Sequence, residues 1–145
     1  MKKTWSLILL VLLIGGCATT PTPISSARQA PTDRVLAFQT TTGEKTATLI
    51  VIRDEGFYGS GCYYAVHING VLAARLSVGE MARFYVEPGE IVLRAGRDPQ
   101  GGGLCNIAVD NNWTQRETVL KLGEQKSFRL SIESQGKLDI HRADF

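Results

Sequence analysis

The residue types that most often perform chemistry are few in this chain and do not form known catalytic signatures. Only two histidines are present, His67 and His141, and both fall in runs predicted to be strands. The chain has neither a G-x-S-x-G nor an H-E-x-x-H pattern, so the spacing predicts no hydrolase elbow and no zinc-protease helix. Asp54 and Glu55 follow a strand, where adjacent acids are typical of a solvated turn. These residues predict no metal site and no enzyme.

The first sixteen residues have the order of a secretory signal. Lys2 and Lys3 supply positive charge, and residues 5–14 are apolar except for Ser6. Such a segment covers about 15 Å as a helix, half the thickness of a bilayer core, and is too short to be a membrane span.

The junction Ile14-Gly15-Gly16-Cys17 resembles the lipobox of bacterial lipoproteins. The resemblance implies that Cys17 is acylated and that the signal, residues 1–16, is cut after Gly16. Ala18, in place of an aspartate, resembles lipoproteins that are forwarded to the outer membrane. We therefore expect a lipid on Cys17 as the membrane anchor, no other cofactor, and a domain that faces the periplasm.

Cys62 and Cys105 are the cysteines that remain in such an exported chain. An even remainder in an oxidising compartment indicates a disulfide. A metal or redox pair would require a C-x-x-C spacing or clustered histidines, which the sequence lacks. The chain-entropy account gives about 4 kcal/mol for closing a loop of this length.

The formal charge of +2 belongs to the signal, because Lys2 and Lys3 account for all of it. The mature chain therefore has a formal charge of zero. Its basic residues are scattered among acids, and a nucleic-acid surface would need them clustered. Charge therefore excludes a nucleic acid as the partner.

Residues 17–33 are predicted to be a lipidated cysteine followed by a tether. The stretch after Cys17, ATTPTPISSARQAPTD, has three prolines and no aromatic residue. This composition favours an extended spacer that packs against no core.

Residues 34–145 have the pattern of one β-domain. Apolar and polar residues alternate, with turn signals about every ten residues. Ala47–Arg53 is a continuous apolar run, typical of a strand covered on both faces. Asn69-Gly70 and Pro88-Gly89 are typical of hairpin turns. The pattern predicts an all-β fold, a β-sandwich or partly open barrel of about seven to nine mostly antiparallel strands.

Aromatic side chains in loops are the candidates for binding. Tyr58 lies in a glycine-rich loop and Trp113 in a polar stretch, and such rings offer a large contact area with little loss of entropy. Tyr63 and Tyr64 are predicted to face opposite sides of a strand. Tyr58 and Trp113 are therefore the candidate partner contacts.

The order of Val66–Gly70 and then Glu87–Glu90 is similar to the PEGA-type β-domain and to a related family of uncharacterised bacterial lipoproteins. That family opens with a strand and a Gly/aromatic loop, which look like Ala47–Ser60 here. The resemblance covers Ala47–Ile132. It implies a sandwich at the cell envelope and carries over no catalytic residues.

Taken together, these features predict a noncatalytic outer-membrane lipoprotein whose β-domain binds an envelope protein or peptidoglycan. An accessory lipoprotein subunit of an envelope or secretion assembly is the second hypothesis. A periplasmic enzyme or enzyme inhibitor is the third, and it would require Asp54, Glu55, His67 or Asp98 to converge in one pocket.

Overall fold

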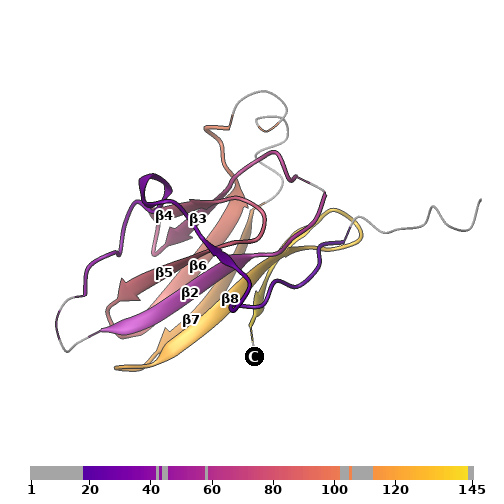
Figure 1. Cartoon of the computed structure of the whole chain (residues 1–145). Coiled ribbons are helices and arrows are strands. Elements are labelled where there is room, and N and C mark those ends of the chain that lie inside the picture. Colours follow the sequence, from indigo (N-terminus) through magenta and orange to yellow (C-terminus); the bar gives the residue numbers. More distant parts are fainter. Residues whose placement is uncertain are drawn as a thin grey trace, which may run out of the picture.

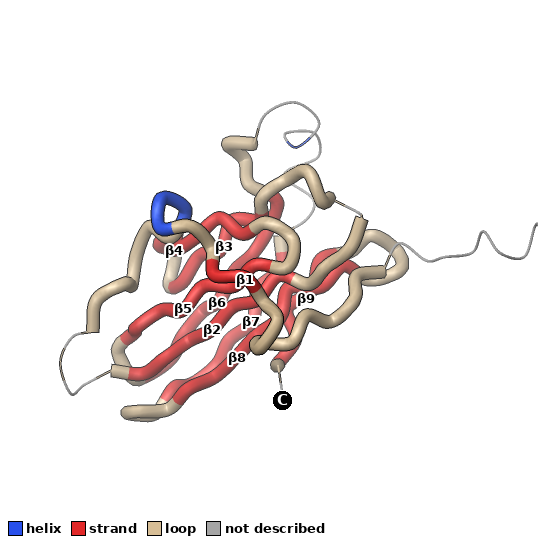
Figure 2. Tube along the Cα trace, viewed as in Figure 1, coloured by secondary structure: helices blue, strands red, loops and turns tan. Residues whose placement is uncertain are grey.

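The structure of the chain, a computed structural model, describes residues 18–41, 43, 46–57, 59–101, 105 and 113–143. Its elements are β1 (Arg28–Gln29), the 3₁₀ helix η2 (Thr32–Arg34), β2 (Ala47–Arg53), β3 (Tyr64–Ile68), β4 (Val71–Leu76), β5 (Glu80–Val86), β6 (Gly89–Arg97), β7 (Thr114–Leu120), β8 (Gln125–Ile132) and β9 (Leu138–Arg142). Figures 1 and 2 show these elements.

The strands form two sheets that pack face to face as a β-sandwich, as predicted. One sheet has the order β1-β5-β2-β8-β9 and the other has the order β4-β3-β6-β7. Buried side chains from both sheets fill the core between them, among them Leu49, Phe84, Leu93 and Leu130. Among the described strands, β1 with β5 and β2 with β8 are parallel pairs, and the other pairs are antiparallel.

Strand β2 lies at the centre of the five-stranded sheet and is covered on both faces, as its continuous apolar run predicts. Leu49 and Val51 point into the core between the sheets. Ile50 and Ile52 point to the outer side, where they pack against Ile24, Ala27, Met81 and Ala143 in a second apolar cluster.

The hairpin turn predicted at Asn69-Gly70 has the expected conformation. Asn69 has φ 49° and Gly70 has φ 82°, the left-handed values that a type I′ turn needs at both positions. Asn69 also fixes the turn to β6, because its Oδ1 accepts a hydrogen bond from the Val92 N–H at 2.8 Å.

The expectation of an extended tether is wrong for the described part of that segment. Residues 18–39, called the strap here, run across the outer face of the five-stranded sheet and along one side of the sandwich (Figure 1). The strap forms β1 beside β5, and Ala30 within it is only 3% exposed. The folded domain therefore includes the strap from Thr19 onward and does not start at Arg34.

Composition failed to predict the strap because backbone groups, more than apolar side chains, hold it. The Arg28 and Ala30 N–H groups donate to the Gly79 and Met81 carbonyls at 2.9 and 2.8 Å. Further along, the Leu36 N–H donates to the Ala73 carbonyl at 2.8 Å. The strap thus pairs with β5 and then with β4, two edge strands whose backbone groups would otherwise lack a partner.

The two ends of the sandwich carry different loops and turns. The end we call the N-terminal pole carries the start of the strap, residues 54–57, 59–63, 77–79 and the β8–β9 turn at 133–137. The opposite end, the distal pole, carries the turns at 69–70, 87–88 and 121–124. The two poles are the full length of the strands apart.

Candidate functional site

Cys62 and Cys105 form the predicted disulfide, with their Cα atoms 5.3 Å apart. The bond lies at the N-terminal pole, where it joins the loop before β3 to the connection between β6 and β7. It therefore holds Cys62 and Cys105 together at the same end of the sandwich.

A buried arginine organises the same loop. Arg53 is 2% exposed, and its guanidinium donates to the Leu76 carbonyl at 2.9 Å, to the Gly59 carbonyl at 2.6 Å and to the Cys62 carbonyl. Its guanidinium carbon lies 3.9 Å from the centre of the Tyr64 ring. Burial lowers the pKa of Arg53 to about 10, so the group is still a cation at neutral pH. Nothing in the sequence pattern indicates this role, because the three carbonyls that Arg53 binds lie in loops and at a strand end.

The candidate contact Trp113 lies on the outer face of the four-stranded sheet, beside residues of β3 and β6. The guanidinium carbon of Arg94 lies 4.4 Å from the centre of its ring. The His67 ring meets it edge-on, with ring centres 5.4 Å apart and planes at 62°. The indole is partly exposed. We call Trp113, His67, Arg94 and their neighbour Gln115 the Trp113 face.

The absence of a side chain at Gly96 makes room for the indole. A methyl group added there would overlap the Trp113 ring, so only glycine leaves room for the indole. We call this position of the ring against Gly96 the seat of Trp113. Burial, reinforced by the charge of Arg94, lowers the pKa of His67, so its imidazole is neutral at neutral pH. The Trp113 face therefore presents an aromatic ring beside the Arg94 cation.

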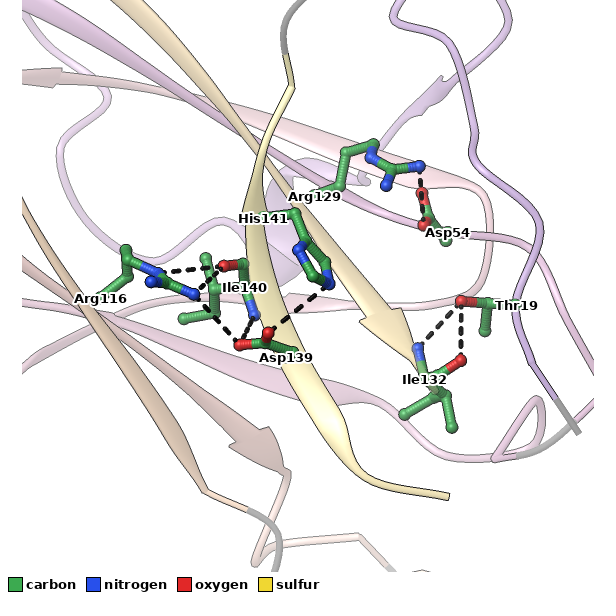
Figure 3. A network of polar contacts seen from close by, with 8 residues as sticks. All are labelled: Thr19, Asp54, Arg116, Arg129, Ile132, Asp139, Ile140 and His141. Carbon is green, nitrogen blue, oxygen red and sulfur yellow. Dashed lines mark hydrogen bonds and ion pairs between the residues drawn. The ribbon is translucent and has the colours of Figure 1, made fainter. Parts of the chain in front are cut away.

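Asp54 corrects one expectation, because it is not in a solvated turn. Its side chain is 1% exposed, accepts the Thr22 N–H at 3.0 Å and lies 3.2 Å from the Arg129 guanidinium. Figure 3 shows this pair on one side of His141 and the Arg116–Asp139 pair on the other. Burial raises the pKa of Asp54. The strap, which the sequence did not predict, is what removes this carboxylate from water.

Glu133, Asp139 and His141 form a cluster with ligand atoms within 4.8 Å of one another. Asp139 already accepts the Ile140 N–H at 2.7 Å and pairs with Arg116 at 3.4 Å. All three residues are partly or fully exposed, and a nearby cation disfavours a bound metal. This cluster therefore gives no reason to revise the prediction of no metal site.

Basic side chains bridge the two sheets along the side of the sandwich where β7 and β9 are the edge strands. Arg116 of β7 donates to the Ile140 carbonyl at 3.1 and 2.9 Å, and Lys126 donates to the Val119 carbonyl. Charged groups on edge strands prevent pairing with another chain. Among the described residues, the edges of β7 and β9 are therefore poor sites for binding another chain.

The enzyme hypothesis requires several acids and a histidine to converge in one pocket, and the structure does not place them in one. Asp54 lies on the outer face of the five-stranded sheet, and His67 lies on the outer face of the other sheet, with the core between them. Asp98 pairs with Arg75 at 2.7 Å, and exposed Glu55 pairs through its backbone with Thr20.

Cys17 and Tyr58 lie outside the described residues, so the lipidation site and one candidate contact stay predictions. The other tyrosine prediction is confirmed. Tyr64 is 3% exposed in the core, whereas Tyr63 on the opposite side of the chain is 42% exposed.

Comparison with known proteins finds no family model, no curated protein and no solved structure that matches this chain. The resemblance to the PEGA-type domain therefore stays a prediction. Within the described residues, no helix has the length and apolar character needed to cross a bilayer.

Proposed function

We propose that the protein is a noncatalytic lipoprotein of the bacterial outer membrane that binds an envelope protein through the Trp113 face. Cys17 would carry the lipid, and the sandwich would face the periplasm. The observation that carries the binding proposal is the seat of Trp113 on Gly96, where a large ring is held partly exposed on a rigid sheet.

Three features of the Trp113 face support a partner there. Tryptophan and arginine are enriched among residues that dominate binding energy, and Trp113 and Arg94 are in contact. Arg94 lies on β6, and Trp113 directly precedes β7, which pairs with β6, so little conformational entropy is lost on binding. The guarded edges of β7 and β9 leave the sheet face as the better surface.

A protein fits this surface better than peptidoglycan. Beyond Trp113, the same sheet face continues as a shallow groove of about 340 Å³ lined by Glu90, Val92, Glu117 and Val119 among others. Val119 is 53% exposed. Aromatic residues and Arg are enriched at the centre of protein interfaces, and polar groups such as Glu90 and Glu117 are typical of the surrounding rim.

In-cell photocrosslinking tests the proposal. A photoreactive amino acid replaces Gln115, beside Trp113, and the matched control replaces Leu122, an exposed residue at the distal pole. We expect a discrete protein adduct from position 115, absent from position 122 and lost when Trp113→Ala is added.

The other functions give different outcomes. Adducts with peptidoglycan fragments from position 115 would replace the protein partner by the cell wall. Copurification of a fixed set of inner-membrane proteins would favour an accessory subunit of an envelope or secretion assembly. No adduct of any kind from position 115 would contradict binding through the Trp113 face.

A further inference from the structure

We infer that Phe57 is a second membrane contact, whose ring enters the bilayer interface beside the acylated Cys17. This inference rests on the lipoprotein proposal, and it adds which pole of the sandwich lies against the membrane. The pole concerned is the N-terminal pole, and the distal pole then points into the periplasm.

The exposure of Phe57 is the first observation. Its side chain is 96% exposed, more than any other large hydrophobic residue that the structure describes. Single exposed apolar residues are common on proteins, so exposure alone assigns no role. The second observation is the position of Phe57 relative to the lipid.

Phe57 follows directly on residues that pair with the start of the strap. The Thr20 N–H donates to the Glu55 carbonyl at 2.7 Å, and a methyl group at Gly56 would lie 2.8 Å from the Thr19 Cγ2. Successive Cα atoms are about 3.8 Å apart, so covalent geometry keeps the Cα of Cys17 within about 8 Å of that of Thr19. The lipid must therefore leave the chain at the pole that carries Phe57.

The loop that carries Phe57 is held from within. The Ser60 N–H donates to the Phe57 carbonyl at 3.1 Å, and Arg53 binds the Gly59 and Cys62 carbonyls from below. The disulfide to Cys105 secures the end of the loop. A ring presented on a fixed loop loses little entropy when it enters a membrane interface.

The exposed charges described at this pole include both signs. Glu55 and Glu133 are acidic, and Lys137 is basic. No excess of positive charge draws this pole to anionic lipid, so the contact is of the apolar kind, which aromatic side chains make at the interface of any bilayer. Vesicles of zwitterionic phosphatidylcholine are therefore a sufficient probe.

The test uses the full, processed chain with a benzophenone amino acid in place of Phe57, or in place of Leu122 as the control. Leu122 is 63% exposed at the distal pole, so it matches Phe57 in chemistry and differs in position. Each protein is reconstituted into phosphatidylcholine vesicles, irradiated and analysed by intact mass. We expect a phospholipid adduct from position 57 and none from position 122.

Several results would overturn the inference. Vesicle-bound, acylated protein that forms no lipid adduct from position 57 would refute the Phe57 contact and leave the lipid anchor standing. A protein adduct from position 57 in cells, without lipid adducts, would make Phe57 a protein contact instead. Protein that carries no acyl group and does not float with vesicles would refute the lipoprotein proposal together with this one.

Discussion

Thr19 and Ile132, 113 residues apart in the chain, are joined by three hydrogen bonds. The Thr19 N–H donates to the Ile132 carbonyl at 2.9 Å, and the Thr19 Oγ1 accepts the Ile132 N–H at 2.9 Å while donating to the same carbonyl at 3.4 Å. These bonds fix the first described residues of the chain to the end of β8. The lipid anchor, if present on Cys17, is then attached to the folded domain with almost no spacer.

If the strap is part of the folded domain, a charge buried within it should lower the stability of the protein, whereas a passive tether would tolerate the same change. Ala30→Asp places a carboxylate at a position that is 3% exposed, so we expect a loss on the order of 3 kcal/mol in the free energy of unfolding. Gln29→Asp adds the same charge at its exposed neighbour and should change little. Urea unfolding of both variants measures the difference. Equal stability of the two would mean that the segment is a passive spacer.

Arg53 is predicted to be a main support of the N-terminal pole. Arg53→Met keeps much of the volume but leaves three carbonyls without their donor, which should destabilise the fold by on the order of 3 kcal/mol. Arg116→Met removes a guanidinium whose side chain is 48% exposed and should cost about 1 kcal/mol or less. Thermal unfolding followed by circular dichroism compares them. A small effect at Arg53 would contradict its role.

The buried carboxylates of Glu80 and Asp54 are predicted to make the free energy of unfolding depend on pH in opposite directions. Burial raises the pKa of Glu80, but hydrogen bonds from Arg34 and the Ser77 N–H outweigh it and hold the pKa below its ordinary value of 4.5. Its contribution to stability is therefore present above pH 4.5 and is lost as the pH falls through the lowered value. Glu80→Gln should destabilise the protein more at pH 7 than at pH 3.

Asp54 should behave in the opposite way. Its pKa is raised above 3.8, mainly by burial, so its neutral form favours the fold at low pH and this contribution is lost as the pH rises. Asp54→Asn keeps an acceptor for the Thr22 N–H and should be tolerated better at pH 7 than at pH 3. Urea unfolding at the two pH values measures both variants. The same trend for Asp54→Asn and Glu80→Gln would refute these assignments.

The seat of Trp113 predicts a specific effect of a single methyl group. Gly96→Ala should displace the indole and destabilise the domain by about 1–3 kcal/mol. Gly61→Ala, where an added methyl group meets open space, is the control. In the processed chain Trp113 is the only tryptophan, so its emission should shift to the red in Gly96→Ala alone. An unshifted spectrum would show that the ring does not rest on Gly96.

The strands and their turns could be predicted because their signals are local. Ala47–Arg53 begins and ends at the predicted residues, and Asn69-Gly70 carries its turn geometry in its own residue types. The disulfide could also be predicted, since an exported chain whose Cys17 is assigned to lipid has two further cysteines and therefore one pairing.

The strap and the contacts beneath it could not be predicted in this way. The residues around Thr19 are polar and proline-rich. Their partners belong to distant parts of the chain: the unpaired edge of β5, the backbone of Glu55 and Ile132, and the Asp54 carboxylate. Asp54 looks solvated in sequence because Thr22 and Arg129, which bury and pair it, lie far away along the chain. The position of Trp113 likewise depends on Gly96 in another strand.

Release of the chain from membranes is the measurement that decides whether a lipid on Cys17 holds the domain. The natural chain and Cys17→Ser are expressed in bacteria, membranes are washed with high salt and carbonate, and retained protein is analysed by intact mass. We predict that the natural chain is retained and carries acyl groups on Cys17, whereas Cys17→Ser is released. Retention of Cys17→Ser through both washes, or a natural chain without acyl groups, would contradict the lipoprotein proposal.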